Sequence, residues 1–221
     1  MTNFPEKFVA DLATLRFADV FNPYSDHCPD HDRPDAPAIR RRNLIQMLAA
    51  AEKMGTDSIW FGRDLGYRGG RRTGLALTDE LHLAALGKAF GDVAIERATL
   101  TQPVAERTAH EIWKMIRRLP TAPFLWNAFP FHPYEPGDPM TNRCHTTREA
   151  RLVEDLLESL LAWLRPARIV ALGNDAHRAL ARMGRQAVCI RHPSYGGQAA
   201  FVAGISNAYG LAPQYQPPLL I

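Results

Sequence analysis

SIWFGRDLGYRGGRRTGLALTDE, residues 58–80, is the stretch that decides the fold we expect. Its first four residues form an apolar, β-prone run, which predicts a buried strand. Five glycines, four arginines and Asp64 follow, before Thr78 and two acids open a predicted helix that continues to about Phe90. Open α/β sheets bind ligands where their strands end. A plain tight turn with solvated arginines explains the same residues, so this stretch alone leaves both interpretations open.

Three later runs have the same buried-strand character, and helical patterns separate them. These runs are Phe124 to Asn127, Arg168 to Leu172 and Ala187 to Ile190. Helices are expected over about 3–18, 40–54, 103–118, 146–164, 174–184 and 198–209. Strands that alternate with helices favour a parallel sheet covered on both faces. We therefore expect an α/β protein with three layers, α/β/α, around a four-stranded parallel sheet.

Local signals predict where several helices begin. Thr146 followed by Glu149 forms a capping box, and Asn174 is the cap expected for the helix after the third strand. The arginines at 40–42 open a helix that runs to about Met54, although their charge opposes the positive end of the helix dipole. A negatively charged partner or a solvated helix face would each account for this triplet.

The composition is that of an ordinary globular protein, with 46% hydrophobic and 22% charged residues. We expect one domain over 1–221, made of N-terminal helices and a loop (1–57), a core (58–209) and a tail (210–221). The formal charge of +3 permits a nucleic-acid partner without requiring one. No apolar run approaches the roughly 18 residues of a membrane span, and the N-terminus lacks the apolar core of a signal peptide.

The three cysteines lie far apart and form no C-x-x-C pair. This spacing argues against a disulfide framework or a zinc ribbon and fits a reducing cytosol, so we expect a cytoplasmic protein. The loop over 21–37 carries five side chains of metal-ligand type, but their spacing matches no closed zinc pattern. They are His27, Cys28, Asp30, His31 and Asp32. We expect a packed surface loop there rather than a metal site.

A polar residue follows each predicted strand closely. They are Asp64, Asn127, Asn174 and His192. Because the carboxyl ends of parallel strands share one rim of the sheet, these side chains are expected along one cleft. Each alone has a simpler explanation, such as capping a turn or packing in a loop. Together, an acid, two amides and an imidazole at one rim indicate an active site.

Three of these motifs, in this order, resemble the uracil-DNA glycosylase superfamily: GRDLGY at 62–67, LWN at 125–127 and HPSYGG at 192–197. The resemblance spans about residues 58–205. It implies the same fold and cleavage of an N-glycosidic bond through an oxocarbenium-like sugar. Asp64 would then hold the attacking water, His192 would donate to O2 of the leaving base, and Asn127 would read O4 and N3 of uracil.

The resemblance also implies contacts around the base and along the DNA. Gly62, Tyr67 and Leu77 would border the base. The expected phosphate contacts are Arg68, Arg71, Arg72, Ser194, Gly196 and Gly197. Tyr195 and the residues after Gly197 are the candidates for filling the space that the extruded base leaves in the duplex.

The sequence departs from the family pattern in three places. Gly66 stands where some members carry the tyrosine that excludes thymine, and Tyr67 comes one position later. Leu77 stands where relatives carry the phenylalanine that stacks on uracil, so Phe61, Phe129 or Tyr67 would have to supply the pocket floor. Members with an iron–sulfur cluster use four cysteines, so with three we expect no cluster, no metal and no other cofactor.

The expected protein is a uracil-DNA glycosylase that acts without a metal, as a monomer, on uracil-containing DNA. Two alternatives stay open. One is a non-catalytic protein that binds DNA or damaged bases. The other is a hydrolase of small nucleosides or phosphoesters on the same architecture.

Overall fold

The computed structural model describes residues 3–212, and its four main strands form one parallel sheet. These strands are β2 (Ser58–Gly62), β3 (Phe124–Asn127), β5 (Arg168–Leu172) and β6 (Val188–Ile190), arranged in the order β3-β2-β5-β6. The expected parallel sheet is confirmed, and each strand lies within one residue of its predicted bounds. A short antiparallel pair, β1 (Val20–Phe21) with β4 (His132–Pro133), lies outside this sheet.

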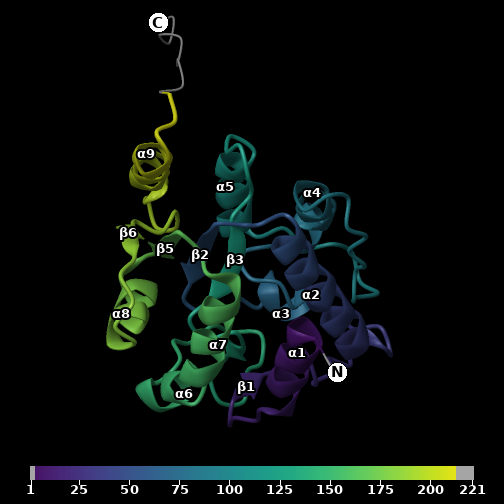
Figure 1. Ribbon diagram of the computed structural model, residues 1–221. Coiled ribbons are helices and arrows are strands. Elements are labelled where there is room, and N and C mark those ends of the chain that lie inside the picture. Colours follow the sequence, from purple (N-terminus) through teal and green to yellow (C-terminus); the bar gives the residue numbers. More distant parts are fainter. Residues whose placement is uncertain (1–2, 213–221) are drawn as a thin grey trace, which may run out of the picture.

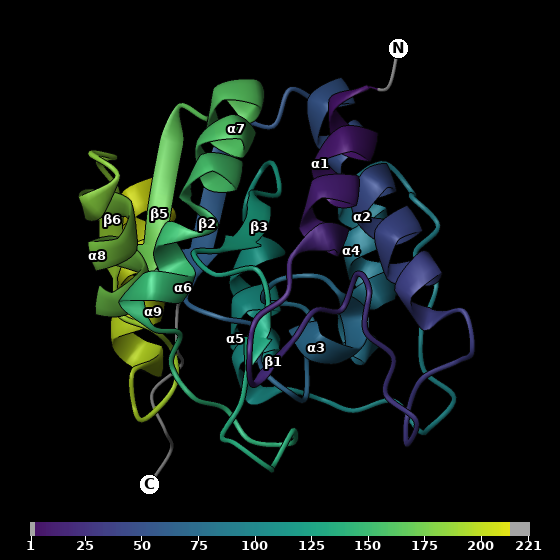
Figure 2. The same ribbon diagram turned by 90° about the horizontal axis from the view of Figure 1, so that it is seen from below.

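Helices cover the sheet on both faces, as expected. Figure 1 shows α5 and α9 on one face and α7 and α8 on the other, while Figure 2 shows α1, α2 and α4 beyond the β3 edge. The helices are α1 (Phe4–Thr14), α2 (Ala36–Lys53), α3 (Gly70–Thr73), α4 (Leu83–Ala89), α5 (Arg107–Ile116), α6 (Thr147–Arg151), α7 (Glu154–Leu164), α8 (Asn174–Arg182) and α9 (Gln198–Tyr209).

Large aromatic side chains fix the helices onto the sheet. Every residue of β2 is buried, which is why the strand reads as an unbroken apolar run rather than as an alternating one. Trp60 meets Phe201 of α9 edge to face, with ring centroids 6.3 Å apart. Its indole N–H donates to the hydroxyl of Tyr209 at 2.7 Å. On the β3 side, Phe8 of α1 packs against Trp126, with ring centroids 5.6 Å apart. This packing holds the ends of β2 and β3 in fixed positions.

The helix expected to start at Thr78 begins differently. Asp79, not Thr78, is the capping residue, because its carboxylate accepts from the backbone N–H groups of Leu81 and His82. A short 3₁₀ turn, η1 (Glu80–His82), then leads into α4. The Thr78 hydroxyl is buried without a hydrogen-bond partner in residues 3–212. The prediction of a continuous helix from Thr78 was therefore wrong.

The arginine triplet lies inside α2 rather than at its start, so that prediction was also wrong. The helix begins at Ala36 because Pro37 sits in its first turn, where proline needs no backbone N–H. Arg40 is fully buried and pairs with Asp32 through two hydrogen bonds of 2.9 and 2.5 Å. The carboxylate of Asp32, considered above as a metal ligand, therefore forms an ion pair with Arg40.

Two other predicted caps have different outcomes. The capping box of Thr146 and Glu149 is present, but it starts the five-residue α6, and α7 follows as a separate helix. Asn174 does not cap α8, because Gly173 is the capping residue and contributes no side chain. The predicted tail, 210–221, lies outside the described residues from position 213 on. No helix of residues 3–212 is long and apolar enough to cross a membrane.

Candidate active site

The carboxyl ends of β2 and β3 bring three of the predicted base-binding residues together. Gly62 at the end of β2 pairs with Asn127 at the end of β3. A Cβ atom at position 62 would lie 2.3 Å from Oδ1 of Asn127 and 2.8 Å from Cδ2 of Leu77. The absence of a side chain on Gly62 therefore lets the amide and the leucine approach the backbone of β2.

Asn127 carries an amide that the rest of the protein leaves unsatisfied. The residue is 1% exposed, and neither its oxygen nor its nitrogen has a hydrogen-bond partner in residues 3–212. An unmade hydrogen bond at a buried polar group costs about 1–3 kcal/mol. Because native proteins rarely keep such groups, each one calls for an explanation. A free donor and a free acceptor side by side are what a ligand with a complementary polar edge requires.

Asp64, two residues after β2, is held in place by two basic side chains. Its Oδ2 accepts a hydrogen bond of 2.6 Å from Nε of Arg63, and its Oδ1 contacts Nδ1 of His145. The carboxylate is 5% exposed. A carboxylate offers about four lone-pair sites, so these two contacts leave room for a water molecule. The predicted catalytic acid therefore lies at the rim, with its orientation fixed.

His145 is a site residue that sequence reasoning missed. It lies 81 positions after Asp64, in the segment before α6, where no strand-end pattern marks it. Its ring packs against Phe129, with centroids 5.3 Å apart. Phe129, one of the residues expected as a possible pocket floor, thus contacts this histidine. The one sequence signal was the basic residue type itself, which is too common to single out a position.

His192 follows β6 and is set up as a neutral hydrogen-bond donor. Its Nδ1 faces the backbone N–H and hydroxyl of Ser194, at 3.2 and 2.8 Å. Because the backbone N–H donates to Nδ1, the ring proton of the neutral form belongs on Nε2. Burial, aided by the positive charges of Arg63 and Arg191, lowers the pKa of His192 to about 4. At neutral pH the imidazole is therefore uncharged, with its Nε2–H as the available donor.

In the loop after His192, two backbone N–H groups donate hydrogen bonds to other atoms of the same loop. The N–H of Ser194 donates to His192, and the N–H of Gly197 donates to the carbonyl oxygen of Ser194 at 3.0 Å. Neither N–H is therefore open to a phosphate, and the Ser194 hydroxyl also contacts the imidazole. Gly196 keeps an exposed position. The predicted phosphate contact through the Gly197 N–H does not fit this arrangement, whereas the contacts of Ser194 and Gly196 stay predictions.

Tyr195 projects from the tip of this loop. It is 96% exposed and has a φ of 49°, a left-handed conformation that costs a bulky residue free energy. Gly197 makes the tight turn possible, since a Cβ there would lie 2.1 Å from the carbonyl oxygen of His192. The loop thus presents an aromatic ring to solvent while holding the imidazole at the rim.

Comparison with known proteins identifies the fold. The chain matches no protein-family model, and it matches no curated protein. Among solved structures, it is similar to the crystal structure of wild-type Pedobacter heparinus SMUG2, with a TM-score of 0.63 and 15% sequence identity. The match covers 95% of this chain and 97% of that one. The chain has a uracil-DNA glycosylase-like fold.

In this glycosylase-like fold, Arg68 is the one arginine of the predicted phosphate-binding set that reaches solvent. It is exposed, and its guanidinium lies beside Tyr67, donating to the hydroxyl at 2.9 Å. The backbone N–H of Tyr67 donates to Oδ1 of Asn142 at 3.0 Å. Tyr67 and Arg68 therefore form a partly exposed pair at the edge of the site.

Arg71 and Arg72 are buried, at 3% and 4% exposure, so the prediction that they contact phosphates does not fit the structure. The guanidinium of Arg71 lies 4.0 Å from the ring centre of Phe21. Arg72 donates from Nε to the buried carboxylate of Glu80 at 2.8 Å and from Nη2 to Thr101 at 2.7 Å. Both arginines stabilise the loop after β2 from inside.

Asn174, the predicted polar residue after β5, is exposed at the start of α8. Its amide oxygen faces the thiol of Cys189 at 3.7 Å. The amide of Asn174 is therefore exposed, unlike the amide of Asn127, which is buried and has no hydrogen-bond partner in residues 3–212. Among residues 3–212, no group of three or more His, Cys, Asp or Glu side chains is placed to hold a metal ion.

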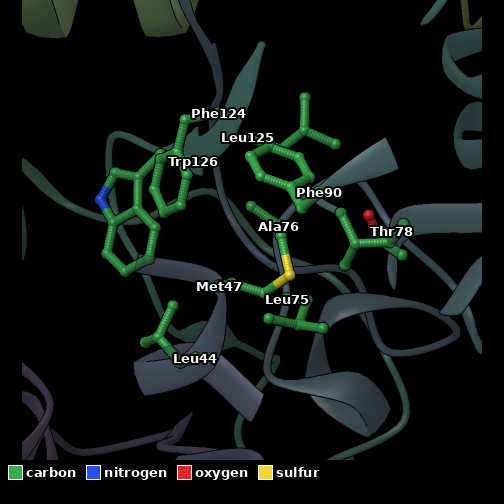
Figure 3. Close-up of a pocket in the computed structure, with 10 residues that line it drawn as sticks. Leu44, Met47, Leu75, Ala76, Thr78, Phe90, Phe124, Leu125 and Trp126 are labelled. Atoms are coloured by element: carbon green, nitrogen blue, oxygen red, sulfur yellow. The ribbon is translucent and has the colours of Figure 1, made fainter. Parts of the chain in front are cut away.

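A small apolar cavity of about 20 Å³ is lined in part by the chain neighbours of two predicted base-binding residues. Figure 3 shows its lining, which includes Thr78 and Trp126, the residues next to Leu77 and Asn127. This volume is close to that of one water probe, far below the space that a nucleobase needs.

Proposed function

We propose that the protein is a DNA repair glycosylase that hydrolyses the N-glycosidic bond of uracil in DNA and leaves an abasic site. The observation that carries this proposal is the buried, unsatisfied amide of Asn127 at the rim that also holds Asp64 and His192. An apolar ligand would leave this amide unsatisfied. A flat base with a polar edge would satisfy it.

The amide suits uracil because of the order of donors and acceptors on the base. Uracil presents an acceptor at O4 and a donor at N3–H, and Asn127 supplies one donor and one acceptor. Cytosine presents the opposite pattern, with an amino group at position 4 and a bare N3. A site that hydrogen-bonds one pattern rejects the other strongly, because the buried amide would stay unpaired.

The chemistry follows from Asp64 and His192. Asp64, oriented by Arg63 and His145, accepts a hydrogen bond from the attacking water and offsets positive charge on the sugar. The base leaves as an anion, with negative charge growing on O2. The Nε2–H of neutral His192 donates to that oxygen, an electrostatic contribution of about 3–4 kcal/mol when compared with oxyanion-hole donors.

Access to the amide requires one movement. Leu77 and Asn127 both lie against Gly62, and the φ of 54° at Leu77 is unusual for a leucine. The flexible end of its side chain shifts at little cost and then packs on one face of the entering base. Tyr195, exposed on its strained turn, takes the place of the extruded nucleotide in the duplex.

The test is an oligonucleotide that carries a single uracil, incubated with the protein and then treated with alkali. We expect strand cleavage at the uracil position, because alkali breaks the chain at an abasic site. Binding without base release would support a non-catalytic DNA binder instead. Release of uracil from free deoxyuridine, with no action on the oligonucleotide, would support a nucleoside hydrolase.

A further inference from the structure

The loop after β2 lies against a carboxyl group that the proposed reaction does not use. A Cβ atom at Gly66 would lie 2.9 Å from Oε1 of Glu106, and one at Gly69 would lie 2.1 Å from Oε2. Both glycines therefore leave room for the Glu106 carboxyl against the backbone. Gly66 is two residues after Asp64, so this carboxyl lies close to the catalytic loop.

Glu106 has no structural task that explains its position. It is the capping residue of α5, where an acidic side chain usually accepts from the first backbone N–H groups, yet its side chain makes no such bond. Neither oxygen forms a hydrogen bond or ion pair within residues 3–212. Only its backbone N–H is engaged, donating to Oδ2 of Asp79 at 2.6 Å.

The surroundings of Glu106 favour its neutral form. Burial and the neighbouring Asp79 carboxylate raise the pKa of Glu106 to about 7, while Arg68 acts in the opposite direction. Asp79 in turn contacts the ring of His82 at 2.6 Å. Glu106 nevertheless keeps partial exposure, so the residue is not part of the sealed core.

Glu106 and the predicted base-binding residues contact the same stretch of chain, which runs from the end of β2 to Gly69. Asn127 and Leu77 lie against Gly62, while the carbonyl oxygen of Thr78 lies 3.5 Å from a Cβ position at Gly69, beside Glu106. Asn127 and Leu77 therefore lie against the start of this stretch of chain, at Gly62, and Glu106 lies against Gly66 and Gly69, farther along the same stretch.

We propose that Glu106 is a specificity-determining residue that donates a hydrogen bond from its neutral carboxyl to a carbonyl oxygen of the extruded base. This proposal rests on the proposed function and adds a second contact to that of Asn127. Deaminated bases carry a carbonyl oxygen where their parent bases carry an amino group. A donor at Glu106 therefore favours deaminated bases.

The proton state of Glu106 decides the sign of this contact. A protonated carboxyl has one O–H donor, whereas an ionised carboxylate only accepts and repels the lone pairs of a carbonyl oxygen. Excision of uracil is thus strongest below the pKa of Glu106 and declines as the pH rises through it. His192 is already neutral over this range, so its titration does not produce the decline.

The experiment compares the pH dependence of kcat/KM for uracil release from a single-stranded oligonucleotide in the wild type, Glu106→Gln and Arg68→Gln. Glutamine matches the shape of the neutral acid and keeps a donor at every pH. We expect wild-type kcat/KM to fall about tenfold or more between pH 6 and pH 8.5, and the Glu106→Gln profile to stay flat. In Arg68→Gln the decline should move to higher pH, because the cation that lowers the pKa of Glu106 is gone.

Thermal unfolding of each variant confirms that the fold is retained. A Glu106→Gln profile that falls as steeply as that of the wild type would overturn the role of Glu106 while leaving the glycosylase function intact. A decline that does not move in Arg68→Gln would also count against Glu106 as the titrating group. If the wild type releases no base at any pH, the proposed function fails, and the role of Glu106 fails with it.

Discussion

Replacing Asn127 with leucine should make the protein more stable and abolish uracil excision. Leucine has nearly the branched shape of asparagine, so it fits between Gly62 and Leu77 with little rearrangement. The substitution removes a buried oxygen and a buried nitrogen that have no partners in residues 3–212. Relieving such unsatisfied groups is worth about 1–3 kcal/mol in the free energy of unfolding.

For a domain of this size, each kcal/mol raises Tm by about 2–4 °C. The assay is thermal unfolding followed by base release from a uracil oligonucleotide, each on the wild type and Asn127→Leu. Asn174→Leu is the matched control, because its amide is exposed and its replacement relieves nothing. A lower Tm for Asn127→Leu, or uracil release at the wild-type rate, would refute the view that this amide is kept unsatisfied for the base.

The remaining predictions concern the other rim residues and the arginines. Asp64→Asn should slow uracil release about a hundredfold or more with little change in DNA affinity, as single-turnover rates and binding titrations would show. Arg68→Ala should weaken DNA binding and reduce the slope of log K against log salt by about one, with unfolding free energy changed by less than about 0.5 kcal/mol. Arg72→Met should instead lower the free energy of unfolding in urea by about 3–5 kcal/mol, since it leaves the buried Glu80 carboxylate unpaired; equal effects of the two arginine variants would contradict their different placement. Because the pKa of His192 is about 4 when folded and its ordinary value is 6.5, the unfolded chain takes up its proton first. Wild-type stability should therefore fall from pH 6.5 to pH 4 more steeply than that of His192→Asn, and parallel curves would argue against a neutral His192.

The sequence predicts the sheet well because buried parallel strands read as unbroken apolar runs. β2 and β3 follow that pattern throughout, β5 follows it after its exposed first residue, and β6, at the edge of the sheet, is apolar although Val188 and Cys189 are exposed. The same logic locates Asp64, Asn127 and His192, because the end of a strand fixes a position in space as well as in the chain. Predicting the positions of these three residues required only the order of the strands and helices.

Residues held by long-range contacts were not predictable in this way. The charge of Arg72 favours a surface position, and only the folded chain brings Glu80 and Thr101 to its guanidinium. His145 and Glu106 reach the loop after β2 from distant segments that carry no motif. Their placement depends on how the segments before α6 and α5 pack, which local periodicity does not encode.

The predicted start of one helix was wrong because two neighbouring residues can both act as an N-cap. Thr78 and Asp79 each favour the N-cap position. Asp79 takes it because its carboxylate also accepts from the backbone of Glu106, while Thr78 is directed into an apolar cavity. That choice rests on tertiary contacts.

The most direct test of the account is the amount of free uracil that the wild type and Asp64→Asn release from the same uracil-containing oligonucleotide, measured by chromatography. The wild type should release one uracil per oligonucleotide and leave an abasic strand. Asp64→Asn should release uracil at least about a hundredfold more slowly at equal DNA occupancy. Wild-type protein that binds the oligonucleotide and releases no base would contradict the glycosylase function. Equal rates from the two proteins would contradict the site assigned to it.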